Sequence, residues 1–146
     1  MSAVELREIT VETVRTICDL EVAPDQRPFV APNGTSIAEA HYAKHAWWRA
    51  IYAGDDPVGF VLLTIEPKKP DVWVWRFMIA APHQGQGHGV AAMKLVIEHA
   101  RKQKGAKRLK LSYVPEPGNP APFYRKLGFA ETGDVEGDEV VMQLDL

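Results

Sequence analysis

The stretch that decides the fold runs from residue 79 to residue 90 and reads Ile-Ala-Ala-Pro-His-Gln-Gly-Gln-Gly-His-Gly-Val. The alternating residues 72–79 predict a strand before it, and the apolar spacing of residues 90–104 predicts a helix after it. Glycines let the backbone turn tightly and approach a ligand. The first N–H groups of a helix lack internal partners and, with the helix dipole, attract an anion. The stretch therefore predicts an anion-binding turn.

The glycine spacing argues against two common nucleotide motifs. A dinucleotide fold needs G-x-G-x-x-G between parallel strands, and counting from Gly85 puts Val90 where the third glycine belongs. A Walker A loop needs Gly-Lys-Ser/Thr, which this stretch lacks. Coenzyme A and nucleotides both carry a pyrophosphate, so the turn alone does not name the ligand, and a glycine turn without a ligand stays open as an alternative.

Patterns on both sides of this turn predict an α+β fold. Strands are expected at residues 4–9, 47–53, 58–65, 109–114, 129–132 and 140–144, and helices at residues 11–20, 36–45 and 120–127. The order β α α β β β α β α β β indicates a mixed, mostly antiparallel central sheet flanked by helices. The 146 residues fit one domain, 1–146.

Local signals refine these elements. Thr10 is expected to cap the first helix, and Ser36 with Glu39 is expected to form a capping box at the start of the second. In the strand 72–79, alternation predicts that Trp73, Trp75 and Phe77 share one face. The residues expected on the other face are Val74, Arg76 and Met78, with Arg76 paired to a buried acid.

Composition excludes several classes of protein and site. The net charge of −2, from 17 basic and 19 acidic residues, argues against a nucleic-acid partner. No apolar run could span a bilayer and no signal peptide is visible, so we expect no membrane association and a cytoplasmic location. Cys18 is the only cysteine, which excludes an intramolecular disulfide. The five histidines lack metal-ligand spacing, so no metal site is expected.

Residues 79–89, followed by a helix, a strand and the sequence Phe-Tyr-Arg-Lys-Leu-Gly-Phe at 123–129, resemble the GCN5-related N-acetyltransferases, or GNAT family. The resemblance covers nearly the whole chain and implies a GNAT-like sheet and acetyl-CoA as co-substrate. Residues 25–33, 75–79 and 111–113 are similar to bacterial polyamine (spermine/spermidine) acetyltransferases. This implies acetyl transfer to the primary amine of a small molecule, with a polyamine or diamine as the preferred acceptor.

The resemblance also implies roles for particular residues. The backbone of Met78 and Ile79 would bind the pantetheine arm and polarise the thioester carbonyl, and Tyr124 would protonate the departing thiolate. The main-chain N–H groups that would hold the pyrophosphate belong to Gln84, Gly85, Gln86, Gly87, His88, Gly89 and Val90. The family often has an asparagine seven residues before the tyrosine; Pro117 stands there, and Asn119 is predicted to contact the cofactor, cap the helix, or both.

An amine acceptor has to lose a proton before it attacks. With a pKa near 10, only about one amine in a thousand is neutral at pH 7. Glu66, Asp71 and Glu116 are candidate bases near strand ends, and each also fits a solvated surface charge. Glu21 and Asp25 lie in the loop that lines the acceptor site in the resembling family, so they are the predicted substrate-binding residues.

The sequence is also compatible with other acceptors and with another activity. The acceptor could instead be an aminoglycoside, an amino acid or a protein N-terminus, because one fold serves many acceptors. A non-catalytic module that senses acyl-CoA is a second alternative, against which Tyr124 argues. Dimers are common in the resembling family, so a homodimer is compatible with the sequence.

Overall fold

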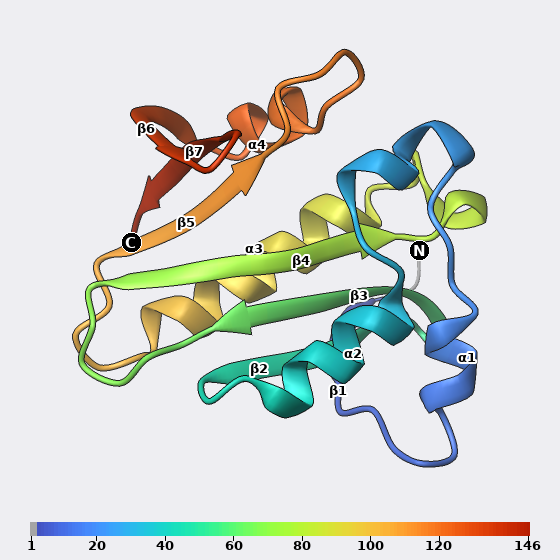
Figure 1. Cartoon of the computed structure of the whole chain (residues 1–146). Helices are drawn as coiled ribbons and strands as arrows, with labels where there is room; N and C mark the ends of the chain where they lie inside the picture. Colours follow the sequence, from blue (N-terminus) through green and yellow to red (C-terminus); the bar gives the residue numbers. More distant parts are fainter. Residues whose placement is uncertain (1–2) are drawn as a thin grey trace.

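A seven-stranded sheet in the order β1-β2-β3-β4-β5-β7-β6 runs through the computed structural model, which describes residues 3–146 (Figure 1). All neighbouring strands within it are antiparallel except the parallel pair β4–β5. The strands are β1 Val4–Arg7, β2 Ala46–Ala53, β3 Asp56–Thr64, β4 Asp71–Ile79, β5 Arg108–Tyr113, β6 Ala130–Glu136 and β7 Glu139–Asp145. The predicted mixed, mostly antiparallel sheet is confirmed.

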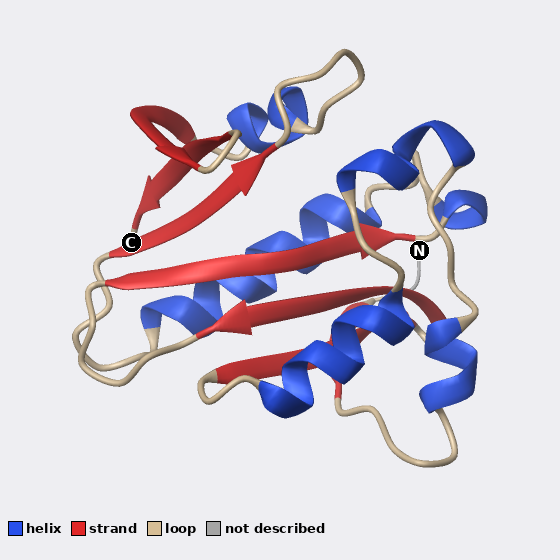
Figure 2. Ribbon diagram, viewed as in Figure 1, coloured by secondary structure: helices blue, strands red, loops and turns tan. Residues whose placement is uncertain are grey.

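Helices cover both faces of the sheet (Figure 2). The α-helices are α1 Val14–Cys18, α2 Asn33–Tyr42, α3 His88–Arg101 and α4 Ala121–Lys126, and the 3₁₀ turns are η1 Pro24–Phe29 and η2 Ala81–His83. α1 and α2 pack on one face, and α3 and α4 pack on the other. None of the helices in residues 3–146 is long and apolar enough to cross a membrane.

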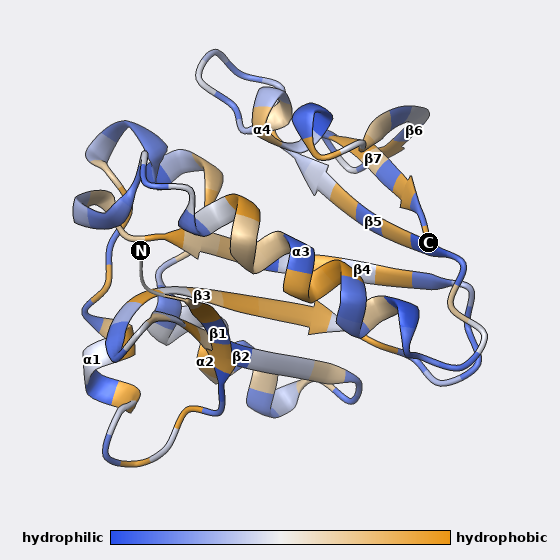
Figure 3. Cartoon of the chain, turned by 180° about the vertical axis from the view of Figure 1, so that it is seen from behind, coloured by the Kyte–Doolittle hydropathy of each residue, from blue (hydrophilic) through white to orange (hydrophobic). Residues whose placement is uncertain are grey.

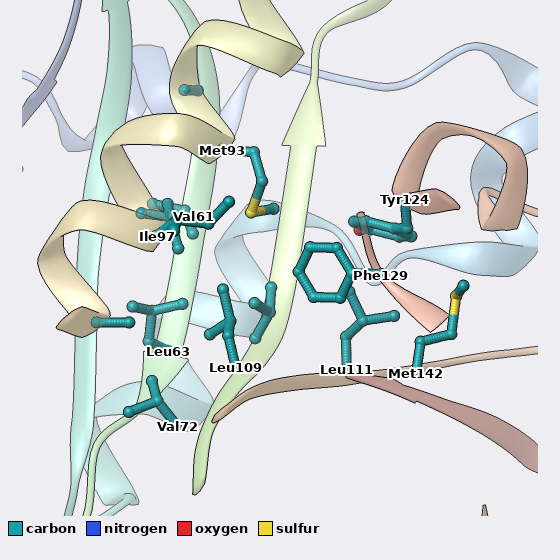
Figure 4. Packing of buried hydrophobic residues seen from close by; sticks show 14 of the residues in the cluster. Val61, Leu63, Val72, Met93, Ile97, Leu109, Leu111, Tyr124, Phe129 and Met142 are labelled. Atoms are coloured by element: carbon teal, nitrogen blue, oxygen red, sulfur yellow. The ribbon is translucent and has the colours of Figure 1, made fainter. Parts of the chain in front are cut away.

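Two hydrophobic cores sandwich the sheet. Residues 58–63 of β3 are buried throughout because helices cover both of their faces, and Figure 3 shows this strand as hydrophobic along its length. The larger core lies under α3, whose buried stripe is Ala92, Met93, Val96, Ile97 and Ala100. Figure 4 shows this core continuing to Tyr124 and Phe129 beside β5. Each large side chain buried here contributes about 1.5–3 kcal/mol of transfer free energy.

A bulge in β4 changes which side chains share a face. Leu62 of β3 pairs with Arg76, but Leu63 pairs with Val74, so Trp75 is the extra residue. After the bulge Phe77 packs in the core under α3, whereas Trp75 packs in the core under α1 and α2. The predicted common face of Trp73, Trp75 and Phe77 is therefore wrong, because simple alternation takes no account of an inserted residue.

The start of α2 also differs from the sequence prediction. The helix begins at Asn33, and no side chain among the described residues caps it, so the capping box at Ser36 does not form. Buried Asn33 instead donates its side-chain amide to the carbonyl oxygens of Ile17 (2.9 Å) and Leu20 (3.3 Å) and fixes α2 against the end of α1. Glu39 reaches Arg76 at 3.5 Å, so Arg76 has an acidic partner, but a partly exposed one.

The α1 helix is shorter than predicted. It begins at Val14, and the backbone carbonyl of Thr10, rather than its side chain, accepts the N–H groups of Thr13 (3.1 Å) and Val14 (2.9 Å). The preceding residues form a turn, which is the ordinary way for a helix to tighten at its end.

The pairing between β4 and β5 is short, and this opens the sheet. Only Asp71, Val72 and Trp73 of β4 pair with β5, at residues 108–110. Asp71 fastens this junction by accepting hydrogen bonds from Arg108 (2.7 Å) and Lys110 (3.2 Å). Beyond it the two strands diverge, as Figure 1 shows. The remaining edge of β4 that faces β5 has no strand partner among the described residues. The Trp75 carbonyl accepts from Arg76 and the Ile79 carbonyl accepts from Gln84, and the other backbone groups of this edge are available to a ligand.

Candidate active site

A cleft of about 1230 Å³ fills the space between the diverging β4 and β5. Its walls come from residues 73–79 of β4, residues 111–113 of β5 and the following Val114, the glycine-rich turn, α4 and the segment around η1. Of the predicted site residues, those on its wall are Met78, Ile79, Gln84, Gly85, Gly87, His88, Gly89, Val90, Asn119 and Tyr124. The divergence of the strands therefore brings together most of the residues that the sequence singled out.

The glycine-rich turn delivers the start of α3 to the cleft. Gly85 and Gly87 have φ angles of 76° and 85°, a left-handed conformation that side chains oppose. Gly87 precedes the helix, and in the described chain no side chain caps the α3 N-terminus. The first N–H groups of α3 are thus available to an anion, as the sequence predicted. Gln86 lies outside the cleft wall and donates to the Pro82 carbonyl at 3.4 Å.

The segment around η1 touches both sides of the cleft. On the β4 side, the amide groups of Gln26 and Gln84 hydrogen-bond each other. Towards α4, the ring of Phe29 lies 3.8 Å from the place where a Cβ on Gly118 would stand. Gln26, Arg27 and Phe29 line the cleft.

Tyr124 projects from α4 into this cleft while most of the residue is buried. It is 8% exposed, and its ring packs between Phe123 and Phe129, with centroid distances of 5.2 and 5.6 Å. Figure 4 shows its oxygen directed toward β4. Burial raises the pKa of the Tyr124 phenol well above its usual value, because a phenolate would lose its hydration. The hydroxyl therefore stays protonated at neutral pH and can donate a proton.

The side chain of Asn119 stabilises the turn before α4. Its side chain accepts a hydrogen bond from the Ala121 N–H (2.9 Å) and donates to the Glu116 carbonyl (2.9 Å). Asn119 thus stabilises the turn that leads into α4, whereas the N-cap position of the helix is Pro120 and has no side-chain cap. Asn119 also lies on the cleft wall.

The opposite face of the sheet contributes residues that sequence reasoning missed. Glu136 and Glu139 are the two acidic residues on the cleft wall in residues 3–146. Ser112 donates a hydrogen bond to Glu139 at 3.1 Å. Ser112 lies on the face away from α4, because its neighbours Leu111 and Tyr113 pack in the α3 core. Residues 108–113 alternate polar and apolar, so Ser112 has the pattern of an ordinary outward-facing residue and the sequence carries no signal that marks it.

The predicted acidic residues lie elsewhere. Glu21 and Asp25 are exposed and are not on the cleft wall, and Glu21 pairs with Arg27 at 3.6 Å. The candidate bases Glu66, Asp71 and Glu116 are also absent from the wall of the cleft as described. The Asp71 carboxylate is paired with Arg108 and Lys110 at the β4–β5 junction. The structure thus concentrates negative charge in the cleft at Glu136 and Glu139.

Known proteins resemble this chain in sequence or in fold. The spermine/spermidine N(1)-acetyltransferase of Bacillus subtilis is 26% identical over 152 residues, covering 97% of this chain and 98% of that protein. A solved acetyltransferase from Thermus thermophilus matches all of both chains with a TM-score of 0.76 at 18% identity. A PaiA N-acetyltransferase from Thermoplasma acidophilum, solved in complex with coenzyme A, covers 99% of both chains with a TM-score of 0.72 at 17% identity.

The family assignment follows from the sequence profile of the Acetyltransferase (GNAT) family, which matches residues 14–129. This range includes the strands that border the cleft on both sides, the glycine-rich turn and Tyr124. The chain belongs to the GNAT family and is an acyltransferase that uses acetyl-CoA as its co-substrate.

Proposed function

We propose that this enzyme acetylates a primary amine of a polyamine or diamine by direct transfer from acetyl-CoA, with Tyr124 as the general acid. The observation that carries the proposal is the cleft itself. It has a buried phenol on the α4 side of the sheet and two carboxylates on the other side. The 26% identity to proteins named spermine acetyltransferases supports the choice of acceptor.

The cleft fits the donor substrate. The edge of β4 at Met78 and Ile79 has no strand partner on the β5 side. Apart from the Ile79 carbonyl, which accepts from Gln84, its backbone groups would bind the amides of the pantetheine arm much as a partner strand would. In the glycine-rich turn after β4, Gly85 and Gly87 have a left-handed backbone and leave open space. No atom lies within 4 Å of the place where a Cβ would stand on either residue. The N–H groups from Gln84 to Val90 would hold the pyrophosphate there, and Asn119 would contact the cofactor from the opposite wall.

Tyr124 would supply the proton that the departing thiolate needs. When the C–S bond breaks, charge accumulates on sulfur, and a phenol with a raised pKa can donate without being ionised beforehand. The ring is fixed by Phe123 and Phe129, which limits the entropy lost in orienting the hydroxyl.

A cationic acceptor is favoured by the side of the cleft away from α4. Glu136 and Glu139 offer carboxylates, and Trp73 and Trp75 line the same cleft with aromatic rings that can hold an ammonium group. Glu21 and Asp25 remain predicted substrate-binding residues. From the exposed loop they would act on the approach of a polycation rather than on the bound amine.

The acceptor is tested by measuring release of the CoA thiol from acetyl-CoA with spermidine, spermine, putrescine, an aminoglycoside, amino acids and an alanyl peptide. The proposal expects kcat/KM to be highest for the polyamines or for putrescine. Faster release with any other amine would contradict the polyamine assignment. Tight acetyl-CoA binding without release to any amine would contradict the enzymatic proposal and favour a sensing module.

The role of Tyr124 is tested by Tyr124→Phe. We expect kcat to fall by about 100-fold or more while the Kd for acetyl-CoA changes less than about twofold. Tyr52→Phe is the matched control, because Tyr52 is also buried but does not line the cleft. Equal turnover of Tyr124→Phe and the unmodified enzyme would overturn the assignment of Tyr124 as the acid.

A further inference from the structure

We infer that Glu139, held by Ser112, is the group that takes the proton from the acceptor ammonium. The inference rests on the proposed amine acetyltransferase function and assigns to a named residue the step that the sequence left open. A protonated amine has no lone pair for attack, and at pH 7 nearly every free aliphatic amine is protonated. An acceptor that arrives as a cation therefore has to give up its proton inside the cleft.

The position of Glu139 in the cleft identifies it as the candidate base. The last paired residues of β4 and β5 are Trp73 and Lys110, so Ser112 lies two residues beyond the point where the strands part. The hydroxyl of Ser112 donates to the Glu139 carboxylate at 3.1 Å and holds it on the cleft wall beside β5. A carboxylate fixed there meets an amine that enters from the face opposite α4.

Glu136 is the other acidic candidate on the cleft wall among the described residues. It lies directly across from Glu139 in the β6–β7 register. Glu136 is exposed, whereas Glu139 is partly buried and has the hydrogen bond from Ser112. The exposed carboxylate suits attraction of a cation, and the fixed one suits proton transfer, because a general base has to lie within hydrogen-bond reach of the proton it takes.

Other charged groups around the cleft do not compete for this role. Arg27 and Arg76 line it as cations and pair with Glu21 (3.6 Å) and Glu39 (3.5 Å). His83 and His88 lie at the glycine-rich end, in and beside the turn that would hold the pyrophosphate. Lys110 on β5 is paired with Asp71 at 3.2 Å.

Bonds and protons balance over one turnover. The ammonium gives one proton to the Glu139 carboxylate, and its freed lone pair forms the C–N bond to the thioester carbonyl carbon. The C–S bond breaks, and the sulfur takes its proton from Tyr124. The surplus proton on the new amide nitrogen returns to the Tyr124 oxygen, directly or through water. Glu139 releases its proton to solvent, so each turnover yields one amide, one thiol and one proton.

The test is the pH profile of kcat/KM for Glu139→Gln, measured between pH 6.5 and 9.5 with putrescine and with the best amine of the acceptor panel. At pH 7 we expect a loss of about 100-fold. Without a base the variant has to bind the neutral amine, whose fraction rises about tenfold per pH unit. The deficit should therefore shrink steadily and be nearly gone by pH 9.5. Glu139→Asp should restore part of the activity at pH 7.

Matched variants separate proton transfer from charge attraction. Glu136→Gln removes the same charge from the same cleft, and we expect it to raise KM with a pH profile parallel to that of the unmodified enzyme. Ser112→Ala should lower kcat/KM at pH 7 by about threefold to tenfold, because the carboxylate loses its fixing hydrogen bond. Thermal melting and the Kd for acetyl-CoA should be unchanged in the Glu139 variants.

Two results would overturn the inference. One is a Glu139→Gln profile parallel to that of the unmodified enzyme, whether lowered or not, and the other is a steep profile in Glu136→Gln instead. In both cases transfer by the unmodified enzyme to spermidine, spermine or putrescine would leave the proposed function standing. The two conclusions can therefore fail separately.

Discussion

The side-chain amides of Gln26 and Gln84 donate to each other's oxygens, with N···O distances of 3.2 and 2.7 Å. Gln84 also donates to the Ile79 carbonyl at 2.8 Å, and Gln26 accepts from the Ala23 N–H at 3.1 Å. The pair joins the segment between α1 and α2 to the glycine-rich turn. One contact thus links the segment around η1 to the turn that would bind the pyrophosphate.

This pair should be energetically coupled. We expect Gln26→Ala and Gln84→Ala each to destabilise the fold, and the double variant to be more stable than the sum of the two losses predicts, by about 1 kcal/mol. Urea unfolding of the four proteins measures this difference. Purely additive losses would show that the reciprocal hydrogen bonds carry no stability of their own.

Gly87 should be required for the donor substrate as well as for the backbone. Gly87→Ala places a side chain at a φ of 85°, and we expect a stability loss of about 1–2 kcal/mol with a clearly weaker Kd for acetyl-CoA. Gly133→Ala is the matched control, because Gly133 has a φ of 89° and lies outside this cleft. It should lose similar stability and keep its affinity; equal loss of affinity in both would contradict the prediction.

Buried Tyr124 should make the fold sensitive to alkaline pH. Its pKa is raised by burial, so above about pH 10 the unfolded chain releases a proton that the folded chain retains. Stability is fully present below that pH and falls above it, by about 1 kcal/mol between pH 10 and 11 for one such group. Urea unfolding at both values should show a smaller fall in Tyr124→Phe. Tyr42→Phe, at a 93% exposed position, should behave like the unmodified protein.

Asp71 should stabilise the junction from which the cleft opens. Burial alone would raise the pKa of its carboxyl, but hydrogen bonds from Arg108 and Lys110 outweigh it and lower the pKa. This stabilisation is present above about pH 4 and is lost as the pH falls through the lowered value. We expect Asp71→Asn to cost about 1 kcal/mol at pH 7, with the difference vanishing at strongly acidic pH.

A matched substitution checks the Asp71 result. Asp55→Asn removes a carboxylate whose side chain is 99% exposed and pairs with Arg7 at 3.2 Å. Its effect should stay below about 0.5 kcal/mol, because solvent screens an exposed pair. Equal effects of the two substitutions would show that the parallel junction has no special need of Asp71.

The sequence by itself determined the order of the elements and the glycine-rich turn before α3. Local signals were sufficient there: the glycines between residues 85 and 89 set a turn, and the apolar stripe of α3 set a helix. The sequence also predicted that Tyr124 lies on a short helix after a proline-rich stretch. These features depend on neighbours in the chain, so their spacing carries the information.

Only the tertiary structure decided which acidic residues line the cleft. The bulge at Trp75 depends on how β3 and β4 align, and alternation along one strand does not reveal it. Glu139 reaches Ser112 because β7 returns beside β5, 27 residues later in the chain. Cross-strand contacts of this kind come from the order and register of the strands. For that reason Glu21 and Asp25 seemed the natural acidic residues from the sequence, whereas the fold places Glu136 and Glu139 in the cleft.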